Sequence, residues 1–113
     1  MADYTIEHVA QFDSALITPI ADMLAQLTAR EYPFGEQELR AIVEDTASKL
    51  FVMRDNERIM GMLTLGHYTS PTGRKVWVED VVVSADYRGK GLGRRLINHA
   101  REYCRENLSP CTL

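Results

Sequence analysis

The sequence predicts a single mixed α/β (α+β) domain over residues 1–113, in the order strand, two helices, three strands, helix. Alternating apolar and polar residues mark the strands, and apolar residues at helical spacing mark the helices. The last three strands are joined by tight polar turns, so they must be antiparallel neighbours in one sheet. Three successive strands without an intervening helix exclude a doubly wound nucleotide-binding fold.

The first half of the chain contributes one strand and two helices. Residues 4–9 alternate and are expected to form the first strand. Apolar residues between 16 and 27 recur at helical spacing, and Thr18 followed by Pro19 predicts an N-cap with proline at the first helical position. A second helix is expected over 36–48, with its apolar residues on one face.

The second half contributes a meander and the most amphipathic helix. Strands are expected over 50–53, 59–65 and 75–83, separated by polar turns. The helix covers about 92–107, and Ser109-Pro110 stops it. Residues 111–113 are the start of a further strand at most.

The composition excludes several classes of protein. With 45% hydrophobic and 26% charged residues, the chain resembles average globular proteins rather than disordered, collagen-like or coiled-coil ones. No apolar run approaches the roughly 18 residues that span a bilayer. Asp3 stands where a signal peptide would carry positive charge. These observations predict a cytoplasmic protein without a membrane partner.

The charge is unevenly distributed along the chain. Residues 1–87 carry a net charge of −7, whereas residues 88–113 carry +4. One short basic segment on an acidic body argues against nucleic-acid binding and suits a compact anionic ligand. Cys104 and Cys111 match no metal-ligand or redox spacing, so free thiols and no metal site are expected.

The segment 88–94, called the glycine loop below, is the most informative part of the sequence. It places three glycines at alternate positions between a strand and a helix. The segment consists of Arg88, Gly89, Lys90, Gly91, Leu92, Gly93 and Arg94. Its spacing fits neither a dinucleotide fingerprint nor a Walker loop. The first amides of a helix lack partners and favour anions, and glycines allow an oxyanion to approach them. We therefore expect a pyrophosphate on the amides of residues 89–94. A flexible turn with a solvated basic rim is the alternative.

Within this loop, Arg88-x-x-Gly91-x-Gly93 resembles the [Q/R]-x-x-G-x-[G/A] signature of the GNAT superfamily of acyl-CoA-dependent N-acetyltransferases. The element order also resembles that family, so the likeness covers nearly the whole chain. The sequence from Glu79 to Gly93 is similar to that of small-molecule amine acetylases, glucosamine-phosphate acetyltransferases among them. The resemblance implies an enzyme that transfers an acetyl group directly from acetyl-CoA to a primary amine.

The resemblance also implies roles for individual residues. The backbone of Val81, Val82 and Val83 would pair with the pantetheine arm of acetyl-CoA, as an added strand does. The glycine loop, from Arg88 to Arg94, would hold the pyrophosphate, and Glu79 would act as the catalytic base. The alternative for Glu79 is an ordinary solvent-facing residue of the strand. Strand alternation predicts that Glu79 shares a face with Val81 and Val83, and that Asp80 points to the opposite face. His67 and Tyr68 either line the acceptor side of the cleft or lie on the surface.

Complete members of the family continue beyond the glycine helix with a strand, a helix and two further strands. Here that C-terminal β-α-β-β portion is expected to be absent or truncated, because only residues 108–113 follow the helix. The edge of the strand at 75–83 would then be uncovered, which favours a homodimer through that edge. The alternative to an acetyltransferase is a non-catalytic acyl-CoA-binding or interaction module derived from a truncated domain.

Overall fold

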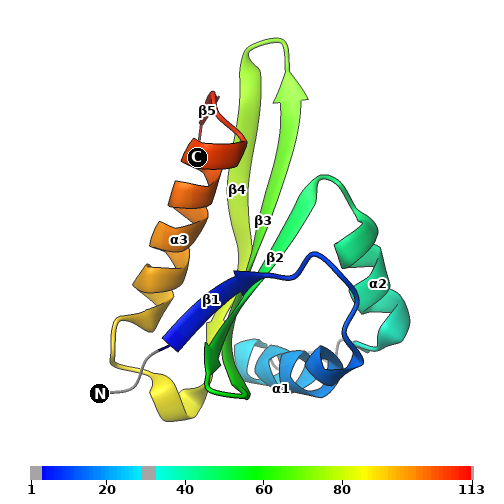
Figure 1. The fold of residues 1–113 in the computed structure, drawn as a ribbon, viewed down its shortest axis with the longest axis vertical. Helices are drawn as coiled ribbons and strands as arrows, with labels where there is room; N and C mark the ends of the chain where they lie inside the picture. The colour runs from blue at the N-terminus through cyan, green and yellow to red at the C-terminus, as the bar shows by residue number, and fades with distance from the viewer. Residues whose placement is uncertain (1–3, 29–32, 113) are drawn as a thin grey trace.

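A computed structural model describes residues 4–28 and 33–112 and contains one five-stranded mixed sheet flanked by helices (Figure 1). The strands follow one another across the sheet in the order β1-β2-β3-β4-β5. The first four are antiparallel, and β5 is parallel to β4. The predicted fold class and element order are therefore confirmed. The elements are β1 (Tyr4–His8), η1 (Ser14–Leu16), α1 (Ile17–Leu27), α2 (Glu36–Glu44), β2 (Ser48–Asp55), β3 (Arg58–Ser70), β4 (Gly73–Val83), η2 (Ala85–Tyr87), α3 (Leu92–Asn107) and β5 (Cys111–Thr112).

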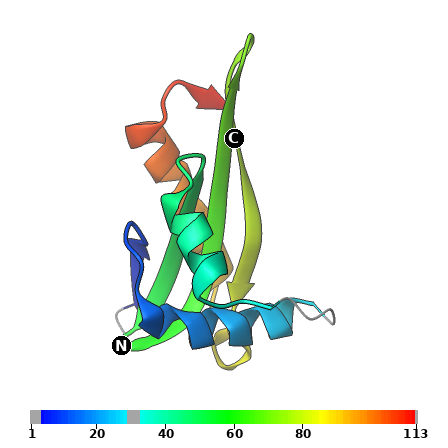
Figure 2. The same cartoon turned by 90° about the vertical axis from the view of Figure 1, so that its right-hand side faces the viewer.

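Helices cover both faces of the sheet, as Figure 2 shows, with α1 and α2 in front of it and α3 behind. Two buried clusters correspond to these two layers. One packs α3 against the sheet through Leu92, Leu96 and Ala100. The other packs α1 and α2 on the opposite face through Leu16, Ile20 and Leu39. The hairpin of β3 and β4 extends beyond both layers at its tip (Figure 1).

Two helix ends differ from the prediction. The regular helix α1 begins at Ile17, so Thr18 is its second residue and not its N-cap. A preceding 3-10 turn, capped by the Asp13 side chain on the Ala15 amide, starts the chain reversal earlier. The helix α2 ends at Glu44 rather than at 48, because Asp45 takes an extended conformation and its side chain accepts hydrogen bonds from the Ala47 amide and Ser48 hydroxyl.

His8 is half-buried at the end of β1, where its ring contacts Phe51 and Tyr103. Burial first, and the positive charge of Lys49 second, lower the pKa of His8 below 6.5. The unfolded chain therefore binds this proton more readily than the folded one, and stability falls as the pH drops below about 6.5.

The variant His8→Phe keeps an aromatic ring at this position but cannot protonate. When the pH is lowered from 7.5 to 5.5, we expect its unfolding midpoint to fall by less than that of the unmodified protein. Unfolding midpoints at the two pH values measure this difference. His99, which also contacts Phe51, is present in both proteins and cancels in the comparison. Equal losses in the two proteins would show that His8 does not contribute to the acid sensitivity.

Both cysteines are free thiols, as expected. Burial and the neighbouring Cys111 raise the pKa of Cys104 to about 11, so its thiol stays protonated at neutral pH and packs as a small apolar group. Within residues 4–28 and 33–112, no helix is long and apolar enough to cross a membrane.

Candidate functional site

A β-bulge interrupts the pairing of β3 with β4 in the middle of the sheet. Thr64 is opposite Glu79 and Met62 is opposite Val82, so Leu63 alone faces two residues of β4, Asp80 and Val81. Asp80 has a φ of 52°, in the left-handed region. Aspartate is among the few residues other than glycine that adopt this conformation at moderate cost. The extra residue therefore changes which side chains of β4 face each layer.

The bulge makes the predicted side-chain alternation wrong. Val76 and Val78 face α3 before it, and Val81 and Val83 face α3 after it. Val82 is buried on the α1/α2 side. Glu79 therefore does not share a face with Val81 and Val83, and it is exposed. A one-residue slip in a strand exchanges the two faces, and the sequence pattern alone does not reveal where that slip occurs.

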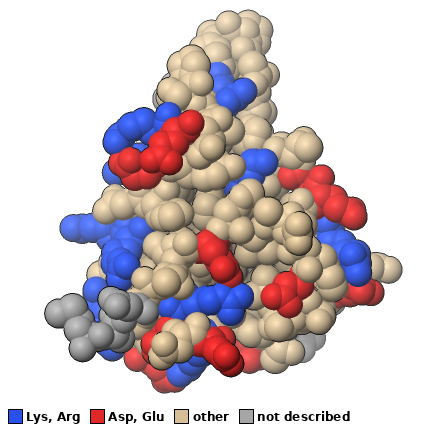
Figure 3. Space-filling model, viewed as in Figure 1, with Lys and Arg blue, Asp and Glu red and all other residues tan. Residues whose placement is uncertain are grey.

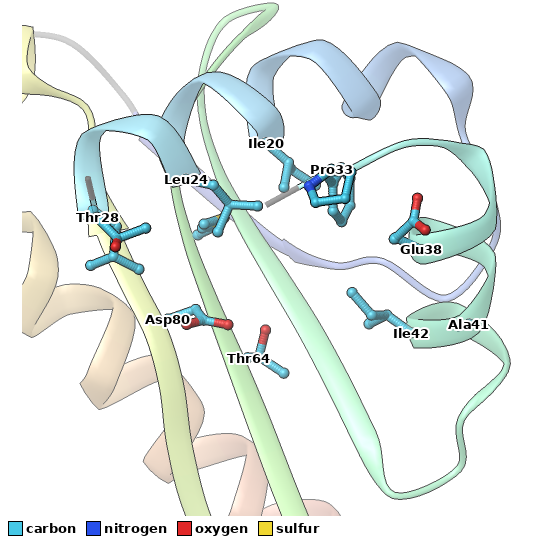
Figure 4. A pocket seen from close by; sticks show the side chains of 12 residues that line it. Ile20, Leu24, Thr28, Pro33, Glu38, Ala41, Ile42, Thr64 and Asp80 are labelled. Atoms are coloured by element: carbon cyan, nitrogen blue, oxygen red, sulfur yellow. The ribbon is translucent and has the colours of Figure 1, made fainter. Parts of the chain in front are cut away.

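Asp80 lines a cavity of about 510 Å³ between α1, α2 and the sheet (Figure 4). We call it the α1/α2 cavity. Its floor is formed by Met62, Thr64 and Asp80, and the Asp80 carboxylate lies close to the Thr64 hydroxyl in Figure 4. Its walls are mostly apolar and come from the two helices and the segment before α2: Ile20, Leu24, Leu27, Thr28, Pro33, Phe34, Glu38, Ala41 and Ile42.

The glycine loop follows directly from the same strand. Gly89 and Gly91 have φ values of 82° and 73°, and a Cβ at either position would point into open space. Gly91 is the N-cap of α3, and the first helical hydrogen bond is donated by the Arg95 amide to the Gly91 carbonyl at 3.2 Å. The amides from Gly91 to Arg94 thus have no partner inside the helix. Unpaired amides at a helix start favour an anion.

Basic side chains lie around the start of α3, and several of them also contact other residues of the protein. Arg88 donates from Nε to the Val83 carbonyl at 3.2 Å, and the Lys90 ammonium lies 5.5 Å from the centre of the Tyr87 ring. Arg95 donates to the Tyr4 carbonyl at 3.5 Å. On the face shown in Figure 3, Lys and Arg side chains gather along the α3 margin. Arg88, Lys90 and Arg95 thus lie near the start of α3, each in contact with another part of the fold.

The turn between β4 and the glycine loop is fixed by residues that the sequence motif does not include. The Tyr87 hydroxyl donates to Asp55 at 2.7 Å, a hydrogen bond that raises the pKa of Tyr87. Arg58 pairs with Asp86 at 2.9 Å, and the Ala85 amide donates to the Gln26 side chain of α1 at 2.8 Å. These contacts come from three separate elements, so spacing along the chain could not have indicated them.

The edge of β4 beside the glycine loop is open over most of its length. Within the described residues, β5 pairs with β4 only at Arg74 and Lys75, which leaves 76–83 without a strand on that side. Val81, Val82 and Val83 lie on this free stretch. Edge strands present unpaired amide and carbonyl groups that can accept an added extended chain.

Two other residues considered from the sequence do not line the cavity. The His67 ring nitrogen Nε2 lies 3.0 Å from the Thr46 carbonyl, in the loop before β2. Tyr68 is 54% exposed and contacts Trp77, which is 40% exposed, on the protruding hairpin. The alternation predicted from the sequence did not indicate that Asp80 lines the cavity, nor that α1 and α2 form its walls. The tolerance of aspartate for a left-handed backbone was the one available signal. No group of metal-ligating side chains occurs in residues 4–28 and 33–112.

Comparisons with known proteins find similarity in sequence and in fold. One curated relative, the uncharacterized N-acetyltransferase YhdJ of Bacillus subtilis, is 30% identical over 71 residues, which cover 62% of this chain and 50% of the relative. This alignment thus spans half the length of that relative.

Solved structures show the same fold. An acetyltransferase of Trypanosoma brucei superposes with a TM-score of 0.77 at 24% identity, covering 98% of this chain and 81% of the other. A GNAT family acetyltransferase of Staphylococcus aureus gives a TM-score of 0.83 at 16% identity, with 98% and 84% covered. The model of the acetyltransferase (GNAT) family matches residues 20–112, which include the α1/α2 cavity, the bulge and the glycine loop. The chain belongs to the GNAT acetyltransferase family.

Proposed function

We propose that the protein transfers an acetyl group from acetyl-CoA to the primary amine of an acceptor held in the α1/α2 cavity. The observation that carries this proposal is the order of features along β4. Asp80 faces the cavity, Val81–Val83 follow on an open strand edge, and the glycine loop follows them. One strand thus connects a place for an amine with a place for a phosphorylated carrier.

The glycine loop is suited to the pyrophosphate of acetyl-CoA. The amides between Gly89 and Arg94 and the side chains of Arg88 and Lys90 are proposed to bind it, since unpaired amides and cations both favour an anion. The backbone of Val81, Val82 and Val83 is proposed to hydrogen-bond the pantetheine arm along the open edge. This arrangement would bring the thioester end of the molecule toward the bulge.

The bound acetyl-CoA supplies an activated acetyl group as a thioester. The amine nitrogen forms a bond to the acetyl carbon, the carbon–sulfur bond breaks, and CoA leaves as the thiol with one proton released overall. An alkylammonium has a pKa of about 10, so it must lose a proton before it can react. We propose that Asp80 binds the ammonium in the cavity and that exposed Glu79, next in the chain, is the base that takes the proton through water.

Calorimetry with acetyl-CoA, followed by thiol release with a panel of amines, tests this function. We expect saturable binding of acetyl-CoA and thiol release that depends on an added amine. Binding without release for any amine would instead select a non-catalytic acyl-CoA-binding module. An absence of binding would refute the assignment of the glycine loop.

We further propose that a second copy of the chain pairs with the free stretch of the β4 edge, at 76–83. An unpaired edge of this length favours pairing with another chain. Sedimentation at tens of micromolar is expected to show a dimer, whereas a folded monomer under these conditions would refute this partner.

A further inference from the structure

The α1/α2 cavity combines apolar walls with acidic ends. Most of its lining consists of hydrocarbon side chains, among them Leu24, Phe34 and Ile42. Its volume of about 510 Å³ lies within the range of pockets for small molecules. Such walls favour a ligand whose body is hydrocarbon, because burying apolar surface is favourable and burying unpaired polar groups is costly.

The polar side chains of the described lining are either acidic or uncharged. Asp80 and Glu38 contribute carboxylates, and Thr28 and Thr64 contribute hydroxyls. Among the lining residues that the structure describes, none is Lys, Arg or His. Glu38 already accepts a hydrogen bond from the Gly35 amide at 2.8 Å, which fixes its position at the start of α2. The carboxylates therefore favour a cation and disfavour an anionic substituent.

The two carboxylates occupy different parts of the cavity. Figure 4 shows Asp80 on the sheet floor, across from Leu24 and beside Thr64, and Glu38 on α2 near Pro33. Asp80 is also the lining residue that immediately precedes the open edge at Val81–Val83. An ammonium at Asp80 would leave the rest of the molecule between the two helices. This placement would select the orientation of a bound ligand as well as its charge.

We infer that the acceptor is an arylalkyl- or alkylamine with an apolar body and no carboxylate or phosphate. This inference rests on the function proposed above and names the substrate class of the same site. The ammonium lies at Asp80 and the hydrocarbon body lies among the side chains of α1 and α2. Amino acids and phosphorylated aminosugars are disfavoured, because their anionic groups would enter a largely apolar space whose described lining residues carry carboxylates and no cation.

Direct binding to the full chain, measured by calorimetry without acetyl-CoA, tests the class with matched compounds. 2-Phenylethylamine and phenylalanine differ only by a carboxylate, and glucosamine 6-phosphate replaces the apolar body with a phosphorylated sugar. We expect 2-phenylethylamine to bind at least about 10-fold more tightly than either of the others, because each of them adds an anionic group beside the carboxylates of the lining. Equal or tighter binding of phenylalanine or glucosamine 6-phosphate would overturn the inference.

Two variants test where the amine binds. Asp80→Asn removes the charge, and asparagine tolerates the left-handed backbone at this position, so the bulge is preserved. Because Asp80 is exposed, we expect this variant to weaken 2-phenylethylamine binding about 2- to 5-fold. Glu44→Gln, an exposed carboxylate on α2 outside the cavity lining, is the control and should leave the affinity unchanged. An unchanged affinity in Asp80→Asn would overturn the placement.

Filling the cavity tests the apolar part of the site separately from its charge. Ala41→Trp places a large ring at the cavity wall from an exposed position on α2, and is expected to weaken 2-phenylethylamine binding about 10-fold or more. Gln37→Trp makes a comparable addition to an exposed position of the same helix outside the lining, and should have no effect. Equal affinities for the two variants would show that the amine binds elsewhere.

The failure of this inference and the failure of the proposed function give different results. If acetyl-CoA binds and thiol release is fastest with phenylalanine or glucosamine 6-phosphate, the function stands and the substrate class is wrong. If acetyl-CoA does not bind but 2-phenylethylamine binds in an Asp80-dependent way, the cavity is an amine site and the transferase function is wrong.

Discussion

Gly91→Glu is expected to abolish measurable binding of acetyl-CoA, with a loss of at least about 100-fold in affinity. Gly91 is the N-cap of α3, beside the unpaired amides of the helix start, and a Cβ there would meet no other atom within 4 Å. The glutamate would place both a side chain and a negative charge where the pyrophosphate is proposed to bind. Calorimetric titration of the variant with acetyl-CoA measures the loss.

The backbone of Gly91 requires a control, because its φ of 73° strains any L-residue by about 1–2 kcal/mol. Gly73→Glu makes the same chemical change at a second glycine with positive φ, the first residue of β4 after the turn from β3. A Cβ there also meets open space. We expect this variant to lose stability and still bind acetyl-CoA. Wild-type affinity in Gly91→Glu would refute the phosphate site at the glycine loop.

Phe51→Ala is expected to lower the free energy of unfolding by about 3–5 kcal/mol. Phe51 is 1% exposed on β2, and its ring lies within 5.2–5.4 Å of the rings of His8, His99 and Tyr103. Removing it leaves a void between the sheet and α3, where the surrounding side chains can relax only partly. Domains of this size are commonly stable by only about 5–15 kcal/mol, so the loss is a large fraction of the total.

Urea unfolding followed by circular dichroism measures this change. Tyr68→Ala serves as the control, because it removes an aromatic ring that is 54% exposed on the protruding hairpin. We expect the control to cost less than about 1 kcal/mol. A similar cost in both variants would mean that the packing around Phe51 does not contribute more than a surface ring contact.

The sequence predicted most of the fold because hydrophobic periodicity reports directly on burial. The helix predicted over about 92–107 is found at Leu92–Asn107, since Leu92, Leu96 and Ala100 repeat on one face and Pro110 limits its extent. The ends of α1 and α2 were less accurate, because side chains such as Asp13 and Asp45 stabilise alternative turns there through local hydrogen bonds.

The two halves of the candidate site differed in how well the sequence indicated them. The glycine loop is a local motif, so its residues could be named from their spacing, and the structure joins them to the start of α3. The α1/α2 cavity joins residues as distant as Ile20 and Asp80. The bulge that turns Asp80 into the cavity depends on a left-handed backbone at one position, which strand alternation cannot represent.

The open edge of β4 links self-association to ligand affinity. A second copy that pairs along the whole of 76–83 and a pantetheine arm bound at Val81–Val83 would exclude one another, because both need the same amide and carbonyl groups. Two ligands that compete for one state of a protein depress each other's apparent affinity by mass action. The midpoint of an acetyl-CoA titration should then rise with protein concentration, and saturating acetyl-CoA should dissociate the dimer.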